Sequence, residues 1–476
     1  MTRFLRPSGS LPAVTRLSTK QRLFFAAAAF SLVVAGCTTG AGSTSTTATP
    51  TTPGETTTTT ALAETTTAPV ETSTTTVEVR VTASDSLDSF VVERIERELA
   101  ELIVEAQEVR GLPYLSTPTV VILDEAEFAD RVANLFSEEF DEEELAIDSR
   151  YRALLGMLPE GTDLYALYID LYAEQVAGFY DGDEGELVVP AAPDGFTPLQ
   201  RITVVHELVH ALTDQHFDVN DDYTTLIDEG NGDDRSAYLA VIEGDAQRAS
   251  FVYLESLSPF DAIQAATEAF AIDTTVFDST PAWIQDDLLF PYRQGLTFTD
   301  SVLGAGGLAG IDETYIDPPT TTEQILDYDK FVAGEGPLDL PPAATELSGW
   351  DIHYEGSFGE WGLRLILGES LLPGEATQAA AGWGNDRYTV YARGDDVAVV
   401  LHYIGDAERD AEELADAFIA HIGTSMNAGS PVESGGGLLY EQGSDYVFLD
   451  RVDDQVFLIA STDKSAGADL RAQLGL

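Results

Sequence analysis

The chain has 476 residues, of which 44% are hydrophobic, so it is long enough to form two domains with buried cores. Its 82 acidic residues outnumber 24 Lys and Arg, which gives a formal net charge of −58. This charge makes nucleic acid and anionic lipid poor partners for the body of the protein. A solvated acidic surface is the simplest interpretation, and a preference for basic substrates is the functional alternative.

The first 36 residues have the order of a secretory signal peptide. A basic lead precedes an apolar stretch, Leu23 to Val34, which is too short for a permanent membrane span. Cys37 is the only cysteine, and Val34-Ala35-Gly36-Cys37 resembles a bacterial lipobox. That resemblance implies cleavage before Cys37 and a lipid on its sulfur. We therefore expect a lipid anchor that holds the protein outside the cytoplasmic membrane, and no intramolecular disulfide.

Residues 37–80 differ from the rest in composition. They are rich in Thr, with Ala, Ser, Pro and Gly, and contain almost no large apolar side chain. Such a segment cannot bury enough surface to order itself, so we predict a disordered linker.

Residues 81–345 contain mainly helical patterns. Apolar residues at helical spacing predict an amphipathic helix over 86–109, and a short apolar run predicts a strand over 117–123. An Asp/Gly turn between two extended pieces predicts a β-hairpin over 178–190. Between the strand and the hairpin, further helices are predicted over 125–135, 142–158 and 163–177.

Two helices after the hairpin carry the residues of chemical interest. Thr197, Pro198 and Gln200 are typical of a capped helix start, and an apolar stripe follows as far as Leu212. A second helix is predicted over 238–257.

The character of the sequence changes after a stretch rich in Gly and Pro at 334–342. Strand patterns then alternate with turns, and two helices are predicted, over 407–422 and 466–474. The predicted strands are 388–392, 397–403, 438–441, 446–449 and 456–460. We therefore predict an α+β protein, with a mainly helical domain and a small antiparallel sheet at 81–345, and an α+β C-terminal domain at 346–476.

The sequence His206-Glu207-Leu208-Val209-His210 lies on the first of the two helices after the hairpin. Two His four residues apart share a helix face and can reach one metal ion. Glu207 is rotated from His206 by about 100°, close to the metal but not coordinated to it. A carboxylate there can take a proton from a zinc-bound water. The motif therefore predicts a zinc site with His206 and His210 as ligands and Glu207 as the general base.

A catalytic zinc needs a third protein ligand and an open position. His216 has the spacing of the third ligand in metzincins, but Thr213 stands where those proteins need a Gly to turn the chain. His216 is therefore better explained as a residue that caps the end of the helix or hydrogen-bonds to a metal ligand. Glu243, among small apolar neighbours on the helix over 238–257, needs a partner when buried, and a metal is a suitable one. We expect Glu243 to be the third ligand, with His216 as the alternative.

A zinc helix followed by a ligand Glu on a second helix resembles the gluzincins, the thermolysin-like peptidases. Glu243-Gly244-Asp245-Ala246 is similar to the third-ligand motif of that family. The resemblance implies a zincin-like fold, zinc-dependent hydrolysis of peptide bonds, and a substrate strand along the hairpin at 178–190. One difference concerns Gln247, where thermolysin-like enzymes often place an Asp, so the group that orients the ligand His is open.

The chain is also similar to a group of bacterial exported proteins over about residues 85–400. The shared sequences, besides the zinc helix, are Gly178-Phe179-Tyr180-Asp181, Pro318-Pro319, Thr322-Glu323-Gln324, Gly382-Trp383-Gly384 and Asp386-Arg387-Tyr388. This similarity implies no particular substrate.

Two further sets of side chains are candidates for the site. Hydrolysis needs a hydrogen-bond donor for the oxyanion. Tyr292 is our first choice for this catalytic role, Tyr315 is a second, and Tyr180 and His216 are weaker ones. A polar and aromatic cluster, made of Trp383, Asp386, Arg387 and Tyr388, either lines a groove or forms a buried Arg–Asp pair under the Trp.

These features predict a membrane-anchored, extracytoplasmic zinc peptidase that acts on a peptide or protein. The alternative is a catalytically silent lipoprotein, stabilised by zinc, that binds an envelope partner. Glu207 argues against the alternative because a binding module has no use for that acid. A third hypothesis is hydrolysis of an amide that is not a peptide, such as one in a cell-wall component. The sequence does not indicate an oligomeric state.

Overall fold

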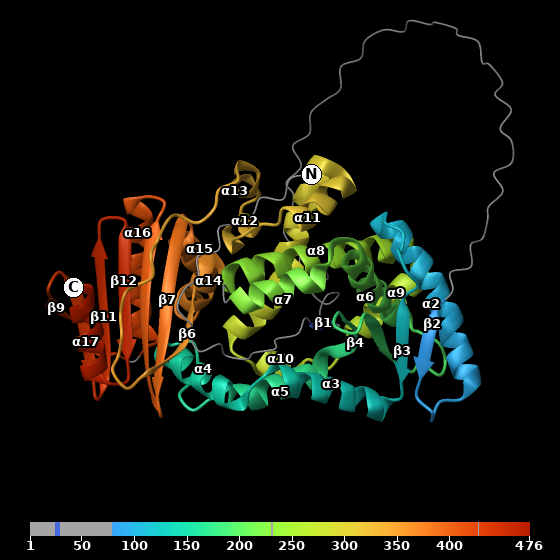
Figure 1. Ribbon diagram of the computed structural model, residues 1–476, viewed down its shortest axis with the longest axis horizontal. Coiled ribbons are helices and arrows are strands. Elements are labelled where there is room, and N and C mark those ends of the chain that lie inside the picture. Colours follow the sequence, from blue (N-terminus) through green and yellow to red (C-terminus); the bar gives the residue numbers. More distant parts are fainter. Residues whose placement is uncertain (1–23, 29–78, 230–231, 427) are drawn as a thin grey trace, which may run out of the picture.

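The computed structural model describes residues 24–28, 79–229, 232–426 and 428–476. They form an α+β fold in which a five-stranded and a seven-stranded sheet lie toward opposite ends, with helices between them (Figure 1). The expected signal peptide at 1–36, Cys37 and the linker at 37–80 lie outside the described residues, apart from 24–28 and 79–80.

The first sheet is mixed, with the strand order β1-β4-β5-β3-β2. Strands β2 (Arg80–Ala83), β3 (Thr119–Leu123) and β5 (Glu186–Pro190) are parallel, and β4 (Val176–Asp181) is antiparallel to β5. The β4–β5 hairpin was predicted, but the expectation of an antiparallel sheet was wrong. Helices connect β2 to β3 and lie between β3 and the hairpin, and such crossovers return the chain in the same direction.

The outer edge of β4 carries one more strand. β1 (Phe24–Ala28), which lies within the expected signal peptide, is antiparallel to β4, with Phe24 opposite Asp181 and Ala28 opposite Val176. The edge of β4 can therefore hydrogen-bond to an extended chain.

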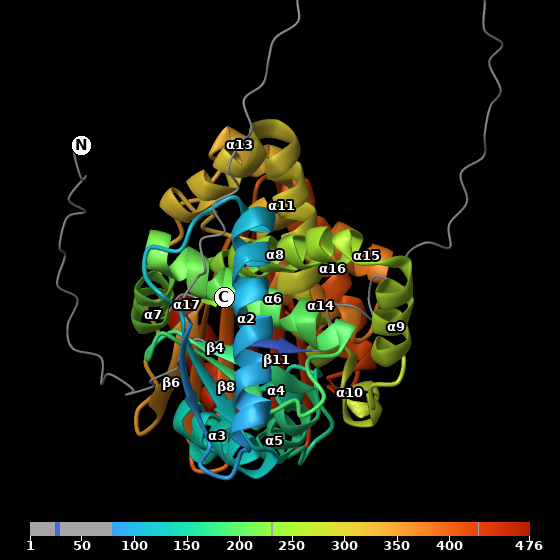
Figure 2. The ribbon, with the colours of Figure 1, turned by 90° about the vertical axis from the view of Figure 1, so that its right-hand side faces the viewer.

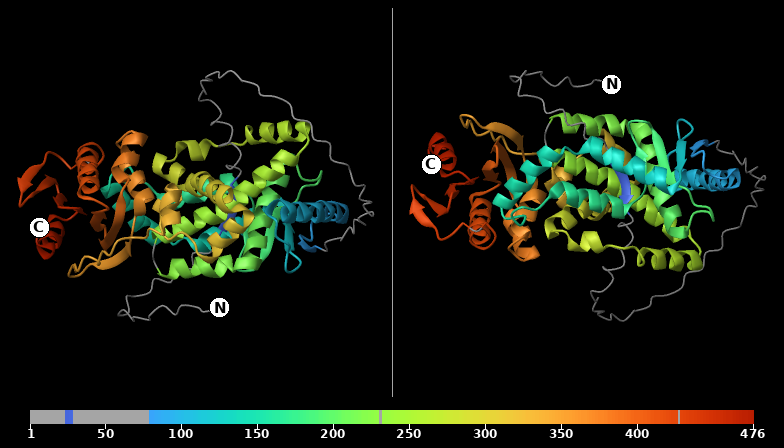
Figure 3. Two further views of the ribbon diagram at one scale, coloured as in Figure 1. Left: turned by 90° about the horizontal axis from the view of Figure 1, so that it is seen from above. Right: turned by 90° about the horizontal axis from the view of Figure 1, so that it is seen from below.

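Within residues 79–175, four helices precede the hairpin, and all of them were predicted. Helix α2 (Ser89–Arg110) packs against α6 and is seen in front in Figure 2. Figure 3 shows that α3 (Glu125–Glu139), α4 (Glu142–Leu154) and α5 (Leu164–Gln175) run between the two sheets on the lower side. An Asp side chain accepts a backbone N–H at the start of each helix, which fixes where it begins: Asp88, Asp124, Asp141 and Asp163.

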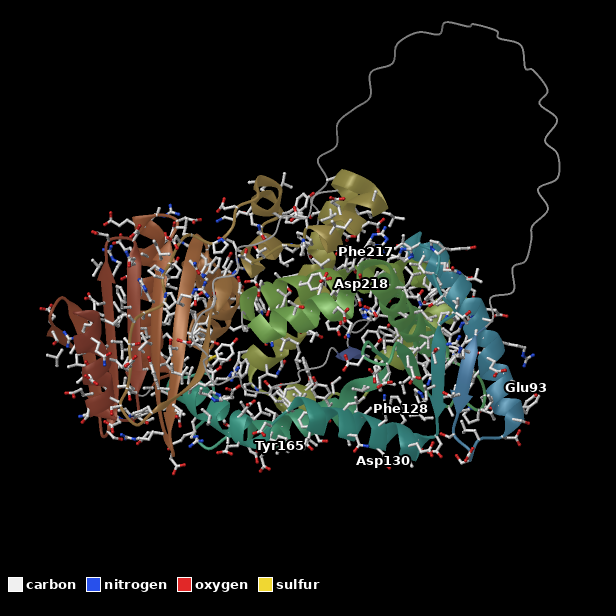
Figure 4. All side chains as sticks on the ribbon, in the orientation of Figure 1. Glu93, Phe128, Asp130, Tyr165, Phe217 and Asp218 are labelled. Carbon is white, nitrogen blue, oxygen red and sulfur yellow. The ribbon has the colours of Figure 1, made fainter. Side chains whose placement is uncertain are left out.

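Helix α6 (Pro198–Phe217) carries the His-Glu motif and starts with the predicted capping box between Thr197 and Gln200. It continues past Thr213 and ends at Asp218, which adopts the left-handed conformation with φ 55°. Figure 4 labels Phe217 and Asp218, where α6 gives way to α7 (Val219–Glu229). The chain therefore turns after His216, not at Thr213 as in the metzincin pattern.

Helices α8 (Gly232–Ser256) and α11 (Ala282–Ile316) cross at very close range. A Cβ atom on Gly244 would lie 2.3 Å from the backbone carbonyl of Gly295, and one on Gly295 would lie 2.1 Å from the carbonyl oxygen of Ala240. Only glycine fits at both positions, and the crossing brings α11 over the centre of α8. The remaining helices of this part are α9 (Pro259–Ala269), α10 (Thr275–Ser279), α12 (Thr322–Leu326) and α13 (Tyr328–Ala333).

The second sheet is antiparallel, with the order β6-β7-β8-β12-β11-β10-β9. It contains the five predicted strands, as β7 (Trp383–Arg393), β8 (Asp396–Gly405), β10 (Gly437–Gln442), β11 (Asp445–Val452) and β12 (Gln455–Ser461), together with β6 (Asp351–Gly356) and β9 (Val432–Ser434). Two predicted helices are confirmed as α16 (Glu408–Thr424) and α17 (Lys464–Leu474), which pack on opposite faces. The helices α14 (Gly359–Gly368) and α15 (Pro373–Ala380) were not predicted.

One hydrophobic core joins the helices of the first part to the second sheet. It contains Tyr151 of α4, Leu171 of α5 and Trp283 of α11, together with Leu363 of α14 and Val399 of β8. The second sheet is therefore packed directly onto the helices that surround α8.

Candidate metal centre

Helices α6 and α8 bring His206, His210 and Glu243 together in the interior. Each of the three residues is at most 2% exposed. Glu243 Oε2 lies 3.0 Å from His206 Nε2 and 3.5 Å from His210 Nε2. One ligand atom from each residue lies within 4.8 Å of the others. The three residues expected as zinc ligands therefore form one buried group.

The packing of the two helices explains this arrangement. His206 and His210 stand one turn apart on α6, and their ring centroids are 4.7 Å apart. Val205 and Val209 of α6 share a core with Ala246 and Ala249 of α8, so the two helices meet along small and branched side chains. The imidazoles and the carboxylate then face each other across that contact.

The electrostatics of the group fit a divalent cation. Burial lowers the pKa of His210 to about 4, so its imidazole is neutral in neutral solution. Burial alone would raise the pKa of Glu243, but the adjoining His210 and His206 lower it to about 2. Neutral imidazole and ionised carboxylate are the forms that bind zinc, and two nitrogens with one oxygen is a common catalytic donor set. The residues present therefore fit zinc.

Glu207 points from α6 toward the first sheet and is completely buried. Its Oε2 accepts a hydrogen bond of 2.9 Å from the backbone N–H of Tyr180 on β4. The side chain of Tyr180 is also anchored, because its hydroxyl donates to Asp214 Oδ2 of α6 at 2.7 Å. Glu207 thus lies between the two His and the strand whose outer edge accepts an extended chain.

Tyr292 of α11 lies over the same group, as expected for the oxyanion donor. Its ring centroid is 6.2 Å from that of His206, and it hydrogen-bonds to Glu243. Burial, together with the charges of Glu243 and Glu207, raises its pKa well above the usual value, so the hydroxyl keeps its proton. The close crossing of α8 and α11 places Tyr292 here, since it stands one turn before Gly295.

The structure places the other candidates elsewhere. His216 Nε2 lies 2.7 Å from the carbonyl oxygen of Pro113, in the loop after α2, and His216 is not part of the group of His206, His210 and Glu243. The hydroxyl of Tyr315 donates to Asp245 Oδ2 at 3.0 Å, beside Arg110. The hydroxyl of Tyr180 is engaged with Asp214.

A cavity of about 270 Å³ opens beside the candidate metal centre. Glu243 and Tyr292 line one end of it, and Tyr168, Tyr172, Leu239 and Leu289 supply largely apolar walls. Asp287 and Arg235, which interact electrostatically, also line it. The sequence did not predict this cavity, because its walls come from five separate helices and one strand.

The cluster at the start of β7 is a buried structural unit, and both expectations for it were wrong. Asp386 is fully buried and accepts hydrogen bonds from Trp383 Nε1, Ser357 Oγ and the backbone of 358 and 359. It therefore neither lines a groove nor pairs with Arg387 in the described part of the chain. The backbone donors come from the start of α14, which the sequence did not reveal.

A second group of acids, Glu323, Glu335 and Asp406, also lies close together. The amino group of Lys330 lies between 2.6 and 2.7 Å from a carboxylate oxygen of each. This group is an ion-pair cluster with its own cation, which links α12 and α13 to the end of β8.

Among the described residues, no helix has both the length and the apolar character of a membrane span.

Comparison with known proteins bears on the C-terminal part. A family model described as a domain of unknown function (DUF8575) matches residues 350–471, from the edge of β6 into α17. No curated protein and no solved structure matches the chain. Residues 350–471, which contain the second sheet, are thus similar to a family whose function is not known, and the candidate metal centre lies outside them.

Proposed function

We propose that the protein is a zinc-dependent peptidase with a zincin-like catalytic part, anchored by a lipid on Cys37 outside the cytoplasmic membrane. The observation that carries the proposal is the buried group of His206, His210 and Glu243, with Glu207 on the same helix. A metal-stabilised binding protein needs the first three residues, but it does not need Glu207.

The edge of β4 supports a peptide as the substrate class. Peptides that add a strand to a sheet edge bind through backbone hydrogen bonds, which suit many sequences. β1 pairs with this edge in antiparallel fashion, and Tyr180 of β4 contacts Glu207. An extended peptide on the same edge would pass beside Glu207.

The residues of the site divide the chemistry between them. When bound by His206, His210 and Glu243, zinc would supply Lewis acidity toward the scissile carbonyl and the attacking water. Glu207 accepts the proton of that water and passes it to the leaving amine. Tyr292, which keeps its proton, would turn that proton from Glu243 to the developing oxyanion. The adjoining cavity receives a substrate side chain next to the scissile bond.

The test compares the native protein with Glu207→Gln, with zinc content and cleavage of a mixed peptide library as the two measurements. We expect about one zinc per chain in both proteins, and a loss of cleavage by at least about 100-fold in the variant. Asp214→Asn is the control. Asp214 contacts Tyr180 and not the three expected ligands, so we expect a smaller loss of cleavage. Zinc without cleavage by the native protein, across peptides and pH, would instead favour the silent lipoprotein.

A further inference from the structure

The imidazole of His206 is held between two side chains of α8. Its Nε2 lies 3.0 Å from Glu243 Oε2, and its Nδ1 lies 3.3 Å from Ser250 Oγ. Ser250 is about two helical turns beyond Glu243, so both stand on the same face of α8. Ser250 is only 3% exposed, so water does not compete freely for its hydroxyl. Helix α8 thus contacts both ring nitrogens of one ligand.

The hydrogen bonding of Ser250 gives this contact a direction. Its hydroxyl donates to the carbonyl oxygen of Ala246 at 2.9 Å. A hydroxyl has one proton and two lone pairs, so Ser250 then faces His206 as an acceptor. In that arrangement Nδ1 of His206 carries the ring proton, and Nε2 presents its lone pair toward Glu243 and His210. This is the tautomer that binds a metal through Nε2.

Without Ser250, the preference of the His206 ring proton for Nδ1 would be weaker. Glu243 alone favours a proton on His206 Nε2, because an ionised carboxylate accepts a hydrogen bond from that nitrogen. Such a proton has to leave before Nε2 can bind a cation. Ser250 instead favours a proton on Nδ1, and it also fixes the rotation of the imidazole ring.

We propose that Ser250 is a positioning residue that holds His206 in the form that binds zinc. It takes the role for which thermolysin-like peptidases often use an Asp at the position of Gln247, and it does so from the next turn of the same helix. The inference rests on the proposed zinc site. Loss of a bond to a metal-binding His commonly lowers metal affinity by about 10- to 100-fold. We expect about 10-fold here, because the acceptor is a neutral hydroxyl.

The experiment measures the zinc affinity of the full chain by competition with a chromophoric chelator. The variants are Ser250→Ala, Ser250→Thr, which keeps the hydroxyl, and Ser256→Ala. Ser256 is a matched control, because its hydroxyl donates to the carbonyl of Tyr253 on the same helix but does not contact a ligand. Thermal unfolding in the presence of a chelator checks that each metal-free variant is folded.

We expect Ser250→Ala to bind zinc about 10-fold more weakly, and Ser250→Thr and Ser256→Ala to stay within about two-fold of the native affinity. Native affinity in a folded Ser250→Ala would overturn the inference. Equal weakening in folded Ser250→Ala and Ser250→Thr would also overturn it, because the hydroxyl would then not be the cause. If the native chain binds no zinc, the proposed function itself fails, and this outcome is distinct from the other two.

Discussion

Two groups of side chains among the described residues could hold a metal ion, and they differ in the cation that each has available. His206, His210 and Glu243 are buried and combine two imidazoles with one carboxylate. Glu323, Glu335 and Asp406 combine three carboxylates, and two of them are exposed. Lys330 already supplies the cation of the second group. Proximity of acids is therefore a weak indicator of a metal site. Buried imidazoles around one carboxylate call for a cation, and among the described residues Glu243 forms no ion pair with a Lys or Arg.

The largest expected effect is the loss of zinc from the first group alone. His210→Ala removes one of three ligands, so we expect no zinc to remain bound after gel filtration. Glu335→Ala makes the matched change in the second group, and its zinc content should equal that of the native chain. Mass spectrometry measures the zinc content of both variants and of the native chain. Loss of zinc from Glu335→Ala, with retention in His210→Ala, would reverse the assignment of the two groups.

The next effect concerns catalysis at constant zinc content. Tyr292→Phe removes the proposed oxyanion donor and should lower kcat by about 100-fold or more, with little change in KM. Tyr315→Phe is the control, because that hydroxyl bonds to Asp245 away from the metal ligands. Steady-state kinetics with a cleaved peptide give kcat and KM for both variants. A kcat in Tyr292→Phe close to the native value would remove Tyr292 from the mechanism.

A smaller effect tests the helix crossing that supports the first group. Gly295→Ala places a methyl group against the carbonyl oxygen of Ala240, and such overpacking should lower the free energy of unfolding by about 1–3 kcal/mol. Gly304→Ala, on the same helix with no atom near its Cβ position, should raise it by up to about 1 kcal/mol. Urea unfolding of the two variants checks this difference. Equal stability would mean that the crossing is looser than described.

The smallest effect concerns the pH dependence of the second group. Burial raises the pKa of Glu323 to about 8, although Lys330 opposes the shift, so the folded chain holds this proton more tightly than the unfolded chain. The stability contributed by the proton is present at low pH and is lost as pH rises through about 8. Glu323→Gln should therefore flatten the fall in stability between about pH 5 and 8. Unchanged pH profiles by urea unfolding would show that Glu323 ionises normally.

The sequence predicted those parts of the site that depend on spacing within one helix. His206, Glu207 and His210 follow from a repeat of one turn, and the capping box at Thr197 located the start of their helix. Glu243 was predicted from its apolar neighbours, and its meeting with the two His depends on contact between α6 and α8. Ser250 was missed because its role needs the rotation of α8 against α6, which no local pattern contains.

The fold was likewise predicted where it depends on local patterns, and missed where it depends on contacts between distant segments. Local patterns located most helices and the strands of the second sheet, since alternation and turns mark a hairpin. The parallel strands β2 and β5 pair with β3 across long connections, and four residues of β2 were too few to form a pattern. The Lys330 cluster likewise joins residues far apart in the chain, with Asp406 contributed by the second sheet.

X-ray absorption spectroscopy at the zinc edge on the zinc-loaded chain tests the proposed zinc site most directly. We expect one zinc per chain in a site with two imidazole nitrogens and a carboxylate oxygen, at about 2.0–2.2 Å. His210→Ala, which should retain no zinc, should give no zinc-edge signal. A zinc surrounded by oxygen ligands alone, or a native chain that binds no zinc, would contradict it.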